Sequence, residues 1–406
     1  MSWTTEDKFI LKLLFAPEKV KAILSGKWFG TEADEKNPDW SVLLEKARRE
    51  GVSAVIFHNL RRQGLADQIP TEILSALSQD YHANLKRNLS IIGALRVVLS
   101  AFQKSTVSCI VLKGIYLAEC IYPNIAMRGM SDVDLLVRKE DLRKADACLS
   151  SLGYAPRDST VALAMHNPAG YLTSLEYRRD PPSPLNLHLH WHLVNTSVPA
   201  TAFIRGIDLD RIWERAACIS LADSTALALC PEHLIVYLCE HALRVGHSFD
   251  RLILICDLFF TVKALEDTID WNGLVEESRR TGLSRFAYHG LSIAKVYTGL
   301  DIPETFLKKL KPLNLSWSER LFFQLQRRNR RIRGNSYFIY LALNRGLFAK
   351  AGFLFRTFFP PRQILRQRRQ VQHSEPAGSN SFSRVREVCS QALKLTSDDP
   401  GRMSSK

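Results

Sequence analysis

The chain has 406 residues, of which 46% are hydrophobic, so it is long enough for two or three domains with sizeable cores. Its net charge of +14 is local, because residues 320–369 hold thirteen Lys or Arg and no Asp or Glu. None of the eight cysteines forms a C-x-x-C pair, which argues against a cysteine-based metal site. No uncharged apolar stretch is long enough to span a bilayer, and the N-terminal residues lack the basic start of a signal peptide. We therefore expect a reduced, cytoplasmic protein.

Residues 1–105 are predicted to form an N-terminal helical domain. Helices are expected over residues 40–50 and 52–63, separated by Gly51, and Pro70 suits the first turn of the next helix. Residues 91–102 have the apolar spacing of a further helix. Because no motif here carries evident chemistry, we interpret the region as a packing domain that shields one side of a sheet.

Residues 109–138 carry the densest chemical signal. The apolar run 109–112 is typical of a buried strand, Lys113-Gly114 interrupts it, and a helix over residues 114–122 is expected to end at Pro123. A second buried strand follows, with Asp132 and Asp134 at its start. Residues two apart on a strand face the same way, so two carboxylates lie side by side and require a cation. Oxygen ligands favour Mg²⁺ or Mn²⁺.

Residues 106–200 are predicted to form this core, with a helix over residues 139–152 and a strand over residues 171–179. Residues 185–193 alternate strictly, as in a half-buried strand: leucines and Trp191 face one side, and three histidines face the other. Three interpretations of the histidine face are open. The histidines are polar residues on a solvated face, or His188 is a metal ligand or base, or the three form a zinc site. These histidines are His188, His190 and His192.

Residues 201–315 are predicted to form a C-terminal helical domain. A short helix or loop is expected over residues 208–219, and longer helices are expected from Pro231 onward. Asp257 lies in the apolar run LILICDLFF, where an unpaired carboxylate would be costly, and His241 or Arg251 is the expected partner. Either this pair is structural, or His241 and Asp257 line a cleft and orient a substrate.

Residues 316–370 are predicted to be a basic amphipathic helical segment, and residues 371–406 a disordered tail rich in Ser, Pro and Gly. Large apolar side chains beside Lys and Arg are typical of a helix at an anionic membrane surface. Phosphates of a nucleic acid would use the same charges, but phenylalanines in apolar clusters make base stacking the less favoured interpretation. A third interpretation is a helical hairpin packed on the body with a solvated basic edge.

Taken in order, these motifs resemble the uncharacterised nucleotidyltransferase family of the polymerase-beta-like nucleotidyltransferase superfamily. The resemblance extends from about residue 40 to about residue 359. It implies an α/β (α+β) nucleotidyltransferase core with a small mixed sheet, flanked by N-terminal and C-terminal all-α domains. The matching residues are Lys113-Gly114, Arg128, the run S-D-V-D-L-L-V over residues 131–137, and Leu189-His190-Trp191.

The resemblance implies metal-dependent transfer of a nucleoside monophosphate from an NTP to an unknown hydroxyl acceptor, with release of pyrophosphate. Asp132 and Asp134 would hold Mg²⁺ or Mn²⁺. Otherwise, Lys113 and Arg128 simply form salt bridges with these two carboxylates. The residues implied to contact the nucleotide are Lys113, Gly114, Arg128 and Ser131.

One position departs from the pattern. The resemblance implies an acidic residue two positions before the histidine of Leu-His-Trp, where this chain has His188. An imidazole there would favour manganese or zinc over magnesium if it binds a metal. The alternative function is a catalytically inactive nucleotide- and metal-binding module that acts as a membrane-associated partner protein, peripheral at the inner membrane face. The further candidate cleft residues are His190, His241 and Asp257.

Overall fold

The structure is a computed structural model. It describes residues 4–24, 38–157, 161, 173–180, 183, 185–194, 206–243, 251–316, 319–320, 340–341 and 346–359. Residues 1–339 and 340–406 form two separate compact units. Most of the basic segment expected over residues 316–370, and the whole tail expected over residues 371–406, lie outside the described residues. The domain boundaries within the first unit stay predictions.

Five α-helices precede the sheet among the described residues. Asp39 caps the third by accepting hydrogen bonds from the amides of Ser41 and Val42. The third and fourth helices confirm the pair expected on either side of Gly51, whose φ of 72° is a conformation that glycine adopts at little cost. The five helices are α1 (Thr5–Phe15), α2 (Pro17–Leu24), α3 (Trp40–Arg49), α4 (Ser53–Arg62) and α5 (Thr71–Lys104).

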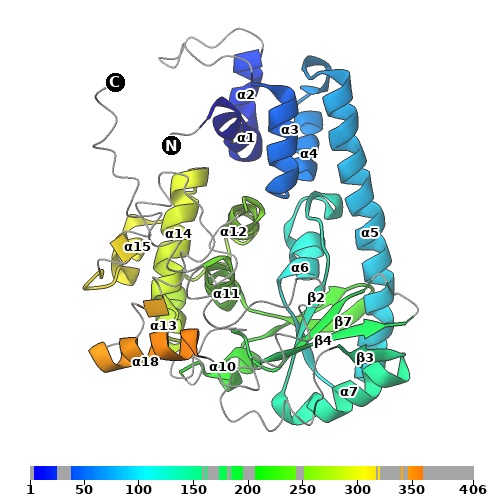
Figure 1. The fold of residues 1–406 in the computed structure, drawn as a ribbon, viewed down its shortest axis with the longest axis vertical. Coiled ribbons are helices and arrows are strands. Elements are labelled where there is room, and N and C mark those ends of the chain that lie inside the picture. The colour runs from blue at the N-terminus through cyan, green and yellow to red at the C-terminus, as the bar shows by residue number, and fades with distance from the viewer. Residues whose placement is uncertain are drawn as a thin grey trace. The chain divides into compact units, whose positions relative to one another are not determined.

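Helix α5 corrects one expectation, because residues 91–102 are not a separate helix. A single 34-residue helix starts after Pro70 and continues to Lys104. No proline interrupts it, and Gly93, the one glycine within it, lies in open space where it is tolerated. Figure 1 shows α5 running from α3 and α4 at one end to the sheet and α7 (Leu142–Ser151) at the other. The helix therefore connects the N-terminal helices with the core.

A mixed seven-stranded sheet forms the core, in the order β3-β4-β5-β2-β1-β7-β6. At its centre β2 pairs antiparallel with β1 and parallel with β5. Strands β6 and β7 follow residue 200 in the chain, and β7 joins the sheet beside β1. The strands are β1 (Cys109–Val111), β2 (Val133–Val137), β3 (Tyr154–Pro156), β4 (Ser174–Arg179), β5 (Leu187–His190), β6 (Ala217–Leu221) and β7 (Ser224–Ala228).

Strand β5 is shorter than the nine-residue strand expected, and its histidine face is not a solvated face. His190 and His192 are buried, and only His188 keeps partial exposure, at 30% of its side chain. Strand β5 is paired along both edges because it lies between β2 and β4, and Leu187, Leu189 and His190 are buried whichever face of the sheet they point to. The interpretation as polar residues in solvent is therefore wrong for the buried His190 and His192, whereas His188 is partly exposed.

Between β1 and β2 the chain forms a short helix, α6 (Lys113–Tyr116), that widens into one π-helical turn over Leu117–Ile121. Pro123 follows it, as the sequence predicts. Residues 125–128 then pack against α5, where Asn88 Nδ2 donates to the carbonyl oxygens of Ile125 and Arg128. These contacts hold the segment that leads into β2.

The C-terminal helices confirm the helical pattern expected from Pro231 to residue 310. They are α11 (Pro231–Leu243), α12 (Ile253–Ala264), α13 (Trp271–Arg280), α14 (Ser284–Thr298) and α15 (Glu304–Leu310). The expected linker over residues 208–219 is the short helix α10 (Leu209–Glu214) followed by β6.

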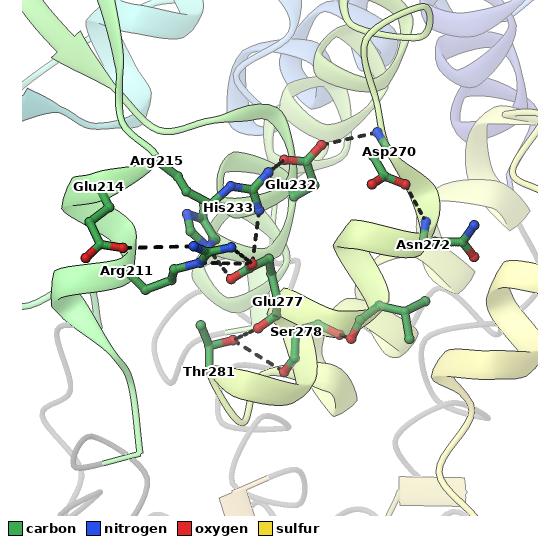
Figure 2. Close-up of polar contacts among 11 residues, drawn as sticks. Arg211, Glu214, Arg215, Glu232, His233, Asp270, Asn272, Glu277, Ser278 and Thr281 are labelled. Atoms are coloured by element: carbon green, nitrogen blue, oxygen red, sulfur yellow. Dashed lines mark hydrogen bonds and ion pairs between the residues drawn. The ribbon is translucent and has the colours of Figure 1, made fainter.

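A network of ion pairs joins α10, α11 and α13 (Figure 2). The buried Glu277 carboxylate accepts from His233 Nε2 at 2.9 Å and contacts Arg215 Nη1 at 3.0 Å. Arg215 also donates to Glu232 at 2.8 Å, and Glu232 accepts from the Asp270 amide. Each carboxylate has at least one cationic partner, so the network is neutralised internally and acts as a structural bridge.

In the second unit the described residues include one long helix, α18 (Leu347–Phe358). Its large apolar side chains Leu347, Phe348 and Phe355 are exposed. Across the described residues, no helix combines the length and hydrophobicity that crossing a membrane requires.

Candidate functional site

Two central parallel strands bring the predicted chemistry together. In the register of β2 and β5, Asp134 lies opposite His188 and Leu136 lies opposite His190. Residues directly opposite on paired strands share a face of the sheet, as do residues two apart on one strand. Asp134, His188 and His190 therefore converge, and their ligand atoms lie within 4.8 Å of one another.

Asp134 is the centre of this group, and its side chain is only 2% exposed. Its Oδ1 accepts a hydrogen bond from His190 Nε2 at 2.8 Å and lies 3.5 Å from His188 Nδ1. Its Oδ2 lies 3.2 Å from Lys113 Nζ. The salt bridge that the sequence left open for Lys113 is thus present. The Asp134 carboxylate therefore contacts one lysine and two imidazoles.

These contacts shift the pKa values of the three groups in different directions. Burial raises the pKa of Asp134, but Lys113 and the histidine hydrogen bonds outweigh burial and hold it well below its usual value. Burial lowers the pKa of His188, yet the hydrogen bond and charge of Asp134 give a net rise. For His190 burial dominates and the pKa is lowered, so this imidazole is neutral at pH 7.

The donor set fits a divalent ion. A buried carboxylate and two imidazoles are ligands that divalent metals take in proteins, and the nitrogen share favours manganese or zinc over magnesium. His190 presents Nε2 to this group, 2.8 Å from Asp134 Oδ1. Asp134, His188 and His190 can therefore hold a divalent metal.

Asp132 lies at the rim of this group. Its side chain is 35% exposed, its Oδ2 lies 3.5 Å from His188 Nδ1, and its Oδ1 accepts from Ser131 Oγ at 3.2 Å. The sequence analysis placed Asp132 and Asp134 as equal partners. In the structure the buried Asp134 has the closer contacts. His190, expected as a cleft residue or as part of a three-histidine zinc site, joins the metal group with Asp134 and His188.

The Lys113-Gly114 turn lies at the same end of β2. A Cβ added at Gly114 would lie 3.5 Å from the Asp132 carbonyl oxygen and 3.8 Å from Arg128 Nη1. The turn, Asp132 and Arg128 are therefore close neighbours, although they are separated by up to 19 positions in the chain.

Arg128 corrects a second expectation, because it pairs with neither Asp132 nor Asp134. Its Nε and Nη2 donate to the two oxygens of Asp257 at 2.8 Å and 2.9 Å. Tyr122 Oη donates to the same carboxylate at 2.7 Å. The expectation that His241 or Arg251 would pair with Asp257 is wrong. His241 is buried on α11, where its ring stacks with Tyr237.

Two residues near the site were missed by the sequence analysis. Tyr122 was considered only as the end of a helix, and Glu176 was not considered. Glu176 lies opposite His188 in the pairing of β4 with β5, and its charge contributes to raising the pKa of His188. No sequence signal identifies Glu176, because its neighbours depend on a strand register that the alternation of β4 does not determine.

Comparison with known families supports the resemblance seen in the sequence. A family model described as uncharacterised nucleotidyltransferase matches residues 36–299, about two thirds of the chain. A search of curated proteins found no match to the chain. The match covers α3 through α14, including the whole seven-stranded sheet and the Asp134 group. On this evidence, the chain belongs to the uncharacterised nucleotidyltransferase family.

Proposed function

We propose that this protein transfers a nucleoside monophosphate from an NTP to a hydroxyl acceptor and releases pyrophosphate. The observation that carries the proposal is the convergence of Asp134, His188 and His190 beside the Lys113-Gly114 turn, in a chain of the nucleotidyltransferase family. A metal group next to a cationic turn suits a triphosphate, which needs both charge neutralisation and directed donors.

In this reaction the acceptor oxygen forms a bond to the α-phosphorus, and the bond from that phosphorus to the bridging oxygen of pyrophosphate breaks. Asp134, His188 and His190 would hold the metal, with Asp132 as a further ligand at the rim. When bound, the metal supplies charge neutralisation on the phosphates. Lys113 and Ser131 would contact phosphate oxygens beside Gly114. The acceptor proton requires a base, and an imidazole bound to a metal has no free lone pair to accept it. His188, the partly exposed group of the three, would be that base in place of a ligand role, with Asp132 then completing the metal site.

A two-step experiment tests the proposal. Thermal shift with the four NTPs, each with Mg²⁺, Mn²⁺ or Zn²⁺, identifies the nucleotide and the metal. Pyrophosphate release and mass detection of a nucleotidylated acceptor then measure transfer, with Asp134→Asn as the inactive control. Metal-dependent nucleotide binding without pyrophosphate release under any condition would support the inactive binding module instead. No binding of any nucleotide would contradict both functions.

A second proposal concerns the basic segment, for which α18 supplies a specific observation. Phe348 is 96% exposed, and Phe355, seven residues later, lies on the same stripe of the helix and contacts the ring of Phe359. Lys350 and Arg356 lie on the same helix, which has no acidic residue. An apolar stripe beside cations fits the surface of an anionic bilayer at its inner, cytoplasmic face.

The membrane proposal is best tested by substitution within the full chain. Truncation before residue 319 would remove Glu319, whose buried carboxylate contacts Arg285 and His289 in the first unit. The variant Phe348→Ser/Phe355→Ser should lower binding to vesicles of acidic lipid, and salt should weaken the binding of the unmodified protein. Equal binding to neutral vesicles would contradict the electrostatic part. Tighter binding to RNA or DNA would move the assignment to nucleic acid, and binding to neither would favour a helix packed on protein.

A further inference from the structure

Arg128, in the segment between α6 and β2, forms an ion pair that includes none of the metal-binding candidates Asp134, His188 and His190. Arg128 and Asp257 come from positions 129 residues apart, and both are buried, with 11% and 2% of their side chains exposed. Asp257 lies on α12, one of the C-terminal helices, so the pair fastens α12 to the segment that enters β2. Tyr122, from the end of the π-helical turn, completes a group of three.

The geometry of the pair leaves Arg128 a single orientation. Both oxygens of Asp257 are engaged by a two-pronged contact with Nε and Nη2, and Tyr122 Oη donates to Oδ1. The backbone is held as well, because Asn88 Nδ2 donates to the Arg128 carbonyl oxygen at 2.9 Å. A guanidinium held at two nitrogens cannot rotate, so its third nitrogen, Nη1, points in one direction.

That third nitrogen faces the Gly114 turn. Nη1 lies 3.8 Å from the position where a Cβ at residue 114 would stand, and it makes no hydrogen bond with any described residue. Asp132, the rim carboxylate, is close enough for its charge to act on Arg128. The N–H groups of Nη1 are thus directed at the turn where Lys113 and the Asp134 group also lie.

We propose that Asp257 and Tyr122 are positioning residues that aim Arg128 Nη1 at the phosphate chain of the nucleotide beside Gly114. The inference deepens the proposed function and rests on it for the identity of the ligand. It makes α12 part of the nucleotide site, although α12 contributes no contact to the metal group.

Arg128 would act on a phosphate through the direction of its N–H groups more than through its charge. The Arg128–Asp257 pair is neutral overall, so its attraction for an anion comes mainly from two N–H donors with a fixed direction. A buried ion pair is also a poor source of stability, since apolar side chains of similar volume often stabilise a fold as well or better. If the pair serves to orient Arg128, removing the Tyr122 hydroxyl should weaken phosphate binding only in part. Replacing Arg128 by lysine, which lacks the planar fork, should weaken phosphate binding more strongly.

Inorganic tripolyphosphate is a suitable probe, because it carries the phosphate chain without the nucleoside. Its affinity for the full chain with Mn²⁺ should be measured by calorimetry for the unmodified protein, Arg128→Lys and Tyr122→Phe. We expect Arg128→Lys to lower the affinity about tenfold or more and Tyr122→Phe to lower it by a smaller factor. Binding of Mn²⁺ alone should be unchanged in both variants, because neither residue belongs to the Asp134 group.

Arg215→Lys is the matched control. It removes a guanidinium that bridges two buried carboxylates, Glu232 and Glu277, in the network of Figure 2. It should leave the tripolyphosphate affinity unchanged while lowering thermal stability. Asp257→Asn is informative only if it folds, so Tyr122→Phe provides the test that keeps both charges.

Two results would overturn the inference: tripolyphosphate that does not bind the unmodified protein, or Arg128→Lys and Tyr122→Phe that bind it with unchanged affinity. Binding that depends on Arg128 in a protein that transfers no nucleotide would uphold the inference and contradict the proposed transferase. Failure of this inference and failure of the proposed transferase function therefore give different experimental results.

Discussion

Asp134 and His188 lie directly opposite each other on the parallel strands β2 and β5, with His188 Nδ1 3.5 Å from Asp134 Oδ1. The family resemblance implies a carboxylate at the position of His188, so an imidazole stands where an oxygen ligand is expected. The replacement removes one negative charge from the site and supplies a nitrogen donor. Both changes favour a metal softer than magnesium.

Replacing His188 tests this consequence. His188→Asp should raise magnesium-supported nucleotide binding, because it restores an oxygen ligand and a negative charge. His188→Ala should weaken Mn²⁺ binding at least as much as the roughly 10- to 100-fold typical of changes next to a metal ligand. Titration with each metal, followed by calorimetry, measures both effects. Unchanged metal preference in both variants would show that His188 is a bystander.

Replacing Asp134 should have larger effects on metal binding and on stability than replacing Asp132. Asp134→Asn should abolish metal binding and destabilise the fold by about 3 kcal/mol, because it leaves Lys113 without its buried carboxylate. Asp132→Asn should weaken metal binding and change stability by less than about 1 kcal/mol, because Asp132 is partly exposed. Urea unfolding and Mn²⁺ titration measure the two properties. Equal effects of the two substitutions would argue against Asp134 as the centre of the site.

Close packing of α11 against α14 gives a prediction about stability alone. A Cβ at Gly290 would lie 2.6 Å from Cys239 Sγ and 3.1 Å from Cys239 Cα, so Gly290→Ala should destabilise the protein by about 1–3 kcal/mol. Gly93→Ala is the control: Gly93 lies within α5 with open space around it, and alanine there should stabilise by about 0.5–1 kcal/mol. Thermal unfolding compares them, and the same sign for both would refute the close approach.

Glu319 gives a prediction about pH. Burial raises the pKa of this carboxyl, but hydrogen bonds from His289 and Arg285 outweigh burial and lower it to about 2. Because the folded pKa lies below the usual value of 4.5, the stabilisation is complete above about pH 4.5 and is lost as the pH falls toward 2. Allowing for screening, its size is on the order of 2 kcal/mol.

Comparison with a substituted protein isolates this contribution from those of other carboxyl groups. Glu319→Gln should be less stable than the unmodified protein at pH 7, and the difference in unfolding free energy should shrink between pH 5 and pH 3. Glu304→Gln, which changes an exposed carboxylate paired with Lys295, should behave like the unmodified protein. A difference between Glu319→Gln and the unmodified protein that does not vary with pH would rule out the titration.

Local patterns determined much of this molecule. The apolar runs 109–112 and 133–137 predicted β1 and β2, the Lys-Gly break between them predicted the turn, and the order of motifs identified the family. Helix positions in the C-terminal part also followed from apolar runs and 3.6-residue periodicity. Helix α13 buries one face, whereas α11 is buried on all sides. These strands, turns and helices depend on residues that are near one another in the chain.

Tertiary structure alone decided which distant residues meet. The sequence could not show that Asp257 would pair with Arg128, because several cations could reach a buried carboxylate and only the packing of α12 selects one. Nor could alternation alone show that His190 would be buried against Asp134, because that depends on which strands flank β5. Strand order and register arise from contacts between elements separated by tens of residues, and a local pattern contains no record of those contacts.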